Sequence, residues 1–440
     1  MFSSLFNVSD PHAPNFFSTT SNVQESQLYG KLEPKDTEWL CSGGFTVETQ
    51  IFYTTTEDGK SLMCQVIHSS TGYVSSILSI ATSFQLARLS RVWYPTVQFT
   101  FKLFDTKTGT KIWKSLNASH FTAGPAGLDK RSCKADEFTV TYKHKADGEF
   151  PESYVLNANL ASDLQVTMEF QRFSTAHGWK LGNGPKGGYS YFGNNQEKPE
   201  GYVIHRFWPR LKSSGHIISA GKAIPIDGFG MFVHAIQGMR PNLVASAWNF
   251  HNFQSNELGG VSGIQMEFTT TDSHGKKGSG SGGVTVNIGS LVVNNKLVAV
   301  TGETNWPGEG RVDTNVLSRT THFDCIHDPD TGYKKPSRLL AEWKGPSILP
   351  DAPGSVSGTV DVSVGDVKNP IGLIEKVDVL AEIPYVVKMA VNYVAGTKPY
   401  IYQWQNPAKM RLTGPDNVAA GLSAGVEVNG ISYMESTFIS

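Results

Sequence analysis

The sequence predicts an all-β protein made of barrels or sandwiches. Apolar and polar residues alternate with a period of two in many short runs along the chain, as they do in half-buried strands. The 44 glycines and 22 prolines are spread over all 440 residues and separate these runs as turns do. Hydrophobic residues make up 39% and charged residues 18%, which excludes an extended disordered protein or a coiled coil. The length favours two or three domains.

The clearest local signal is a hairpin near the start of the chain. Residues 45–56 alternate as a strand, Glu57-Asp58-Gly59 is typical of a tight turn, and residues 62–67 run back. The same alternation predicts further strands at 96–104, 138–142, 164–173, 231–239, 264–270, 284–288, 339–343, 360–364, 376–383, 399–405 and 431–439.

One segment has the pattern of a helix. Pro384 lies in its first turn, Gly396 follows its end, and its apolar residues fall on one stripe, as in Val387, Ala390 and Val391. We therefore expect a helix over 384–396 that closes or flanks a barrel.

Residues 74–92 interrupt the strand pattern. Small, β-branched and basic residues follow one another there without a clear period, and removing them restores a compact hairpin. The segment is interpreted as an insertion outside the barrel or as a retained intron in the gene model.

The polar and small residues of 209–220 predict the break between domains. The predicted organisation is a flexible N-terminal segment at 1–36, a first domain at 37–212 that includes the insertion, and a second domain at 213–440.

Charge and cysteine content exclude several classes of function. Lys and Arg number 38 against 39 Asp and Glu, which argues against a nucleic-acid partner. The four cysteines show no disulfide or CxxC spacing, and neither a signal peptide nor a spanning helix is visible, so a reducing, cytoplasmic setting is expected. Glycine-rich stretches do not open helices and His322, Asp324, Cys325 and His327 split between two strand faces, so no cofactor, metal site or catalytic residue is predicted.

The most unusual composition surrounds the predicted domain break. Residues 205–210 combine two aromatics, two arginines and a histidine, and aromatic strands with amides and imidazoles follow. These residues form either an interdomain core or a ligand cavity with apolar walls and a few orienting polar groups. The candidate lipid-binding residues of the second interpretation are Trp208, His234, Gln237, Trp248 and Phe250.

Long strings in this region and beyond resemble the fungal survival factor 1 family over residues 37–440. They are HRFWPR (205–210), HAIQGMRP (234–241), WNF (248–250), AEIP (381–384), GTKPYIY (396–402) and ESTFIS (435–440). The resemblance implies two lipocalin-like, calycin-type β-barrel domains in tandem with few short helices.

The same resemblance implies a function. It indicates a non-enzymatic protein that binds ceramide or a related sphingolipid, carries it from the endoplasmic reticulum to the Golgi, and supports survival of oxidative stress. The expected location is the cytoplasm and the surfaces of these two membranes, with a nuclear pool left open. The alternative is a lipocalin-fold isomerase, hydratase or cyclase that acts on a hydrophobic small molecule, which is an analogy of fold alone.

The N-terminus predicts a weak, transient contact with membrane surfaces. Phe2, Leu5 and Phe6 share one face of a single helical turn, which Pro11 prevents from extending. No basic residue precedes Lys31, so the attraction to anionic lipid is small.

Overall fold

The computed structural model describes residues 14–21, 23–70, 95–275, 283–310, 313–379 and 399–439. Within these ranges the chain is almost entirely β-structure, with one short α-helix, α1 (Pro241–Val244). The all-β fold expected from the sequence is therefore confirmed. Four 3-10 turns complete the described elements: η1 (Glu25–Gln27), η2 (Pro34–Asp36), η3 (Glu257–Gly259) and η4 (Leu422–Ala424).

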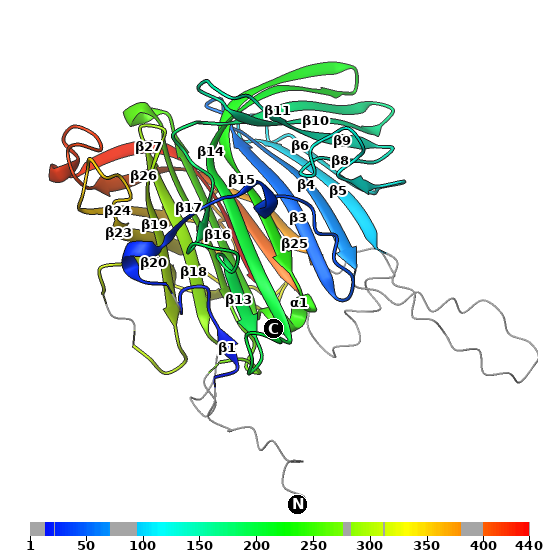
Figure 1. Cartoon of the computed structure of the whole chain (residues 1–440). Coiled ribbons are helices and arrows are strands. Elements are labelled where there is room, and N and C mark those ends of the chain that lie inside the picture. The colour runs from blue at the N-terminus through cyan, green and yellow to red at the C-terminus, as the bar shows by residue number, and fades with distance from the viewer. Residues whose placement is uncertain are drawn as a thin grey trace, which may run out of the picture.

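The first sheet is an antiparallel half-barrel in which the last long strand pairs with the first (Figure 1). Its spatial order is β6-β5-β4-β3-β15-β14-β11-β10-β9-β8-β7. The strands are β3 (Thr46–Thr55), β4 (Lys60–Ser70), β5 (Thr96–Asp105), β6 (Lys111–Asn117), β7 (Thr122–Ala123), β8 (Cys133–Lys134), β9 (Phe138–His144), β10 (Glu152–Ala161), β11 (Leu164–Arg172), β14 (Gly201–Ser219) and β15 (Lys222–Gln237).

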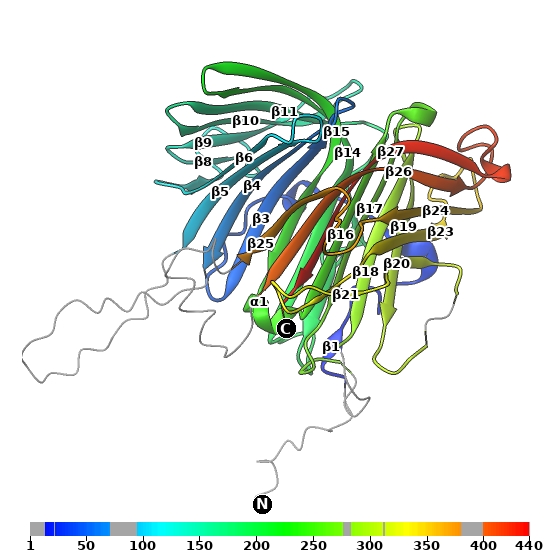
Figure 2. The same ribbon diagram turned by 180° about the vertical axis from the view of Figure 1, so that it is seen from behind.

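The second sheet is a nearly closed antiparallel barrel with the order β19-β18-β17-β16-β27-β26-β24-β23-β20. Its strands are β16 (Ala247–Ser255), β17 (Val261–Thr269), β18 (Thr285–Val293), β19 (Lys296–Asn305), β20 (Leu317–Phe323), β23 (Arg338–Pro346), β24 (Ser355–Ser363), β26 (Tyr400–Thr413) and β27 (Val426–Phe438). A small hairpin of β21 (Ile326–His327) and β22 (Lys334–Lys335) follows β20. An additional strand, β25 (Leu373–Asp378), pairs with β26. Figure 2 shows β25 at the line where the two sheets meet.

Both sheets follow one plan. In each, the first strand pairs with the last, β3 with β15 and β16 with β27. Among the described strands, the seam without pairing follows the fourth strand of each series. Consecutive strands are mostly neighbours, which is the up-and-down meander of lipocalin-like barrels. The expected tandem of two such units is confirmed.

The chain passes from the first sheet to the second between β15 and β16, not at the predicted boundary of 212 and 213. That boundary falls inside β14, whose residues pair with β11 on one side and β15 on the other. Small residues occur there because the backbones approach closely: a Cβ on Gly215 would lie 2.1 Å from the Thr167 carbonyl oxygen. The polar, small composition therefore belongs to a long hairpin instead of a linker.

The described part of the N-terminal segment is packed, which corrects the prediction that 1–36 is flexible. β1 (Phe16–Phe17) pairs with β13 (Tyr189–Phe192), and β2 (Tyr29–Lys31) pairs with β12 (Trp179–Leu181). The Phe16 ring is 1% exposed and contacts Phe192, Phe268 and Trp306. The segment bridges the two sheets, because Phe192 belongs to the first and Phe268 to the second.

Strand alternation produces three apolar cores. Phe52 on β3 faces the interior of the first sheet, whereas its neighbour Tyr53 faces the second sheet. On β16, Phe250 faces the first sheet and Phe253 the barrel interior. The middle core, between the sheets, is therefore built by both halves of the chain.

Several predicted segments lie outside the described residues. These are the helix at 384–396, the insertion at 74–92 and the membrane-contact residues Phe2, Leu5 and Phe6. The strands on either side of the insertion are paired as predicted, since Ser69 of β4 faces Thr96 of β5. None of the helices in the described chain has the length and hydropathy needed to span a bilayer.

Candidate functional site

The residues predicted to bind lipid lie on two different faces. Trp208 and His234 point into the first sheet, where Trp208 packs with the core of that sheet. Trp248 and Phe250 belong to the core between the sheets. Gln237 is half-buried and lies on the same face of β15 as Val233, which belongs to the middle core. The structure thus separates the predicted set into two groups.

His234 of β15 links the first sheet to the segment that precedes β3. Its Nδ1 lies 3.0 Å from the Asp36 carbonyl oxygen and its Nε2 lies 2.8 Å from Oε1 of Glu48. Glu48 also accepts hydrogen bonds from the backbone N–H groups of Leu40 and Cys41. Burial acts to raise the pKa of Glu48, but these bonds outweigh it and the pKa is lowered. Both ring nitrogens of His234 are therefore engaged within the protein.

A buried ion cluster reinforces the same segment. Asp36 accepts a hydrogen bond of 2.8 Å from Lys180 and lies 3.5 Å from Arg206, and all three side chains are buried. Trp208 packs nearby against Tyr154 and Phe232, with ring centroids 5.0 and 5.2 Å apart. These contacts indicate that the interior of the first sheet is packed as a core.

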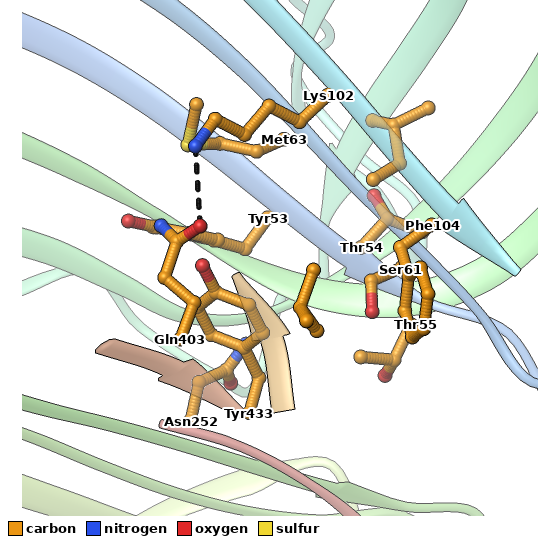
Figure 3. A pocket seen from close by; sticks show the side chains of 12 residues that line it. Tyr53, Thr54, Thr55, Ser61, Met63, Lys102, Phe104, Asn252, Gln403 and Tyr433 are labelled. Atoms are coloured by element: carbon orange, nitrogen blue, oxygen red, sulfur yellow. Dashed lines mark hydrogen bonds between the residues drawn. The ribbon is translucent and has the colours of Figure 1, made fainter. Parts of the chain in front are cut away.

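A pocket lies between the two sheets (Figure 3). The cavity is small, about 30 Å³, which is room for a water molecule or a small polar group. The first sheet supplies residues from β3, β4 and β5, and the second supplies one residue from each of β16, β25, β26 and β27. The lining residues are Tyr53, Thr54, Thr55, Ser61, Leu62, Met63, Lys102, Phe104, Asn252, Ile374, Gln403 and Tyr433.

One side of this pocket carries a chain of hydrogen bonds. Lys102 Nζ donates to Gln403 Oε1 at 3.1 Å, as the dashed line in Figure 3 shows. Gln403 Nε2 donates to Glu435 Oε1 at 2.6 Å, and the Tyr433 hydroxyl donates to the same oxygen at 2.5 Å. Lys102 also lies 3.7 Å from a carboxylate oxygen of Glu375. The one cation among the lining residues is therefore balanced by carboxylates beside the pocket.

Aromatic rings form the adjoining wall. Tyr53 stacks on Phe250 with ring centroids 4.8 Å apart and lies 5.4 Å from Tyr433. Burial raises the pKa of both tyrosines, and the nearby Glu435 carboxylate adds to the effect. Both hydroxyls therefore stay protonated and uncharged near neutral pH.

Two buried polar groups on the pocket wall lack a hydrogen-bond partner within the described structure. They are Nδ2 of Asn252, whose residue is 0% exposed, and Oγ of Ser61, whose residue is 8% exposed. Buried polar groups are nearly always paired with protein or water, so these two are available to a ligand or to water.

The sequence predicted only part of this site. Phe250 is the predicted residue that contacts two pocket tyrosines, and Asn252 lies two positions further along the same strand face. The clustered aromatic and amide residues of 248–254 carried that signal. Ser61, Gln403 and Tyr433 carry no comparable local signal, because only the packing of the two sheets brings them together.

A second, larger and more open hollow of about 350 Å³ lies at the seam of the second barrel. Its lining includes Glu25, Glu303 and Glu309 as well as several threonines. Carboxylates and hydroxyls make it less suited to acyl chains than the pocket between the sheets.

Comparison with known proteins identifies the family. The model of the Svf1 family matches residues 1–440. The chain belongs to the Svf1 family. A Schizosaccharomyces pombe member named ceramide-binding protein svf1 is 30% identical over 425 residues, covering 96% of this chain and 93% of the relative. A Candida albicans member of the same name is 31% identical over 423 residues, covering 95% and 91%.

Two solved structures are similar to this chain in fold. A putative AttH from Nitrosomonas europaea has a TM-score of 0.47 at 14% identity and covers 92% of this chain and 97% of its own. Kievitone hydratase from Nectria haematococca has a TM-score of 0.46 at 10% identity and covers 97% and 98%.

Proposed function

We propose that this protein binds ceramide in the pocket between its two sheets and carries it between endoplasmic reticulum and Golgi membranes, in support of survival under oxidative stress. The names of its relatives support a ceramide ligand. The observation that carries the proposal is the pocket itself, which combines apolar walls with unpartnered polar groups on Asn252 and Ser61.

The chemistry of the pocket suits a neutral lipid head group. Amide and hydroxyl side chains line it, and the charge of Lys102 is held by Gln403 and Glu375. A ceramide head group offers an amide and hydroxyls, which pair with such groups without adding charge. The cavity is too small for acyl chains, so they would displace packed side chains of the apolar middle core, where each buried CH₂ contributes about 0.8 kcal/mol.

We propose a carrier and not an enzyme. A carrier has to shield acyl chains and to release them, and needs no group that forms or breaks a covalent bond. Uncharged amide and hydroxyl groups, such as those of Asn252 and Ser61, are typical of a site that orients its ligand.

We further propose that the protein is cytoplasmic and touches endoplasmic reticulum and Golgi membranes only transiently, through Phe2, Leu5 and Phe6. The small apolar area of three side chains and the absence of basic residues before Lys31 support a weak interaction.

A matched pair of variants tests the binding site. Ile374 is 8% exposed and lines the pocket, whereas Ile371, three positions earlier, is 49% exposed. Ile374→Trp is expected to fill the pocket and weaken ceramide binding at least about 10-fold, and Ile371→Trp is expected to leave it unchanged. Binding is measured by native mass spectrometry with a ceramide, and transfer by exchange between donor and acceptor vesicles. Equal binding by folded Ile374→Trp and the parent protein would contradict the proposed location.

A further inference from the structure

We propose that Asn252 and Tyr433 recognise the amide linkage of the lipid. Asn252 donates a hydrogen bond to the carbonyl oxygen of this amide, and Tyr433 accepts one from its N–H. This inference rests on the proposed function and deepens it, because it names the chemical group that the pocket selects. It follows from the direction in which two hydrogen-bond chains run.

The first chain fixes the orientation of the Asn252 amide. The Arg210 guanidinium can only donate, and its Nη1 lies 2.9 Å from Oε1 of Gln254. Gln254 therefore turns its Nε2 toward Asn252 and donates to Oδ1 at 2.8 Å. With Oδ1 occupied, Nδ2 of Asn252 is the atom left without a partner among the described residues. Asn252 thus offers donors, and the ligand has to supply an acceptor.

The second chain fixes the polarity of the Tyr433 hydroxyl. The Lys102 ammonium can only donate, so Gln403 accepts through Oε1 and turns its Nε2 toward Glu435. Glu435 is an acceptor, and the Tyr433 hydroxyl gives its hydrogen to it. Tyr433 thus has no proton left to offer, and its oxygen can accept one hydrogen bond from a ligand.

The two groups are neighbours on the pocket wall. Asn252 of β16 and Tyr433 of β27 are directly paired in the antiparallel register, and both line the pocket. Side chains in such pairs begin about 5 Å apart at their Cβ atoms. A secondary amide carries its C=O and N–H on opposite edges of one planar group, so it can bridge a donor and an acceptor set side by side. Ser61 of β4 lines the same pocket and is left for a hydroxyl of the head group.

This arrangement also disfavours other lipids. An ester carbonyl satisfies Asn252 but brings no hydrogen for Tyr433. A phosphorylated head group would bring negative charge beside Glu435 and Glu375, with Lys102 already shared between Gln403 and Glu375. The inferred preference is therefore for a neutral lipid with an unsubstituted amide.

The experiment is a thermodynamic cycle with three purified full-length proteins and two lipids. The lipids are a short-chain ceramide and the same ceramide methylated on the amide nitrogen, which keeps the carbonyl and loses the N–H. We expect the parent protein to bind the methylated lipid about 10-fold more weakly. Tyr433→Phe should weaken ceramide binding by a similar factor and bind both lipids alike, whereas Asn252→Leu should weaken both lipids equally.

These variants leave the remaining partners satisfied. Gln254 Nε2 also donates to Ser262 Oγ at 2.9 Å, and Glu435 retains its bond from Gln403. Tyr402→Phe is the matched control, because Tyr402 donates to a buried carboxylate, Asp328, at 2.8 Å but does not line the pocket. It should discriminate between the lipids as the parent protein does.

The possible outcomes distinguish the inferred recognition of the amide from the proposed binding of ceramide. The inferred recognition of the amide alone is overturned if the parent protein binds ceramide and the methylated lipid equally well. It is also overturned if folded Tyr433→Phe discriminates between the two lipids as strongly as the parent protein does. Absence of any ceramide binding by the parent protein overturns the proposed function and, with it, this inference.

Discussion

Removing the Glu48 carboxylate is expected to destabilise the protein severely. Glu48 is 0% exposed, and its two oxygens accept from His234 and from the backbone N–H groups of Leu40 and Cys41. Glu48→Ala leaves these donors without their partner, at about 1 to 3 kcal/mol for each buried group. Even if water replaces part of the carboxylate, the expected loss is about 4 kcal/mol. That is a large share of the roughly 5 to 15 kcal/mol typical of a folded domain.

Urea unfolding at neutral pH, followed by tryptophan fluorescence, measures this loss. Glu48→Gln keeps one carbonyl acceptor and should cost less than half as much as Glu48→Ala. Glu427→Ala is the control, because Glu427 is an exposed partner of Lys409 and its removal should not change the unfolding midpoint. A loss below about 1 kcal/mol for Glu48→Ala would refute the view that Glu48 and His234 hold the entering segment in place.

Three further predictions follow from burial, loop length and apolar area. The pKa values of Glu48 and Glu152 are lowered from 4.5 in the folded state. The stability that these carboxylates give the fold is therefore complete above about pH 5 and is lost as the pH falls through the folded pKa. Measuring the unfolding midpoint as a function of acid pH checks this. Deleting residues 74–92 should change thermal stability by less than about 1 kcal/mol, because loop length has a small effect, and a variant that fails to fold would contradict the insertion. Liposome flotation should leave most of the protein unbound. Strong, salt-insensitive flotation that is lost on removing residues 1–13, which precede the packed strand β1, would mean that this contact is stronger than we infer.

The strands were predictable from the sequence because their signal is local. Alternation at 96–104 marks β5, and alternation at 138–142 marks β9, each within a few residues. The division of the chain was not predictable in the same way. Ser213, Ser214 and Gly215 have the composition of a linker, but their neighbours in space, β11 and β15, give them a place in a continuous sheet.

The candidate site was predictable only where it coincides with unusual composition. Phe250 and Asn252 lie in an aromatic strand that stands out in the sequence. His234 also stands out, yet its environment depends on Glu48 and Asp36, which are distant in sequence and occupy both ring nitrogens. An imidazole or a carboxylate looks the same in the sequence whether it lies in a packed core or in a binding site. Only its partners in the folded structure distinguish these two environments.

The most direct test of the central claim is photocrosslinking with a ceramide that carries a photoreactive group next to its amide. Peptides that contain residues of β16 and β27, around Asn252 and Tyr433, are expected to carry the label, and Ile374→Trp should abolish it while Ile371→Trp retains it. Labelling confined to the interior of the first sheet, around Trp208, would contradict the account.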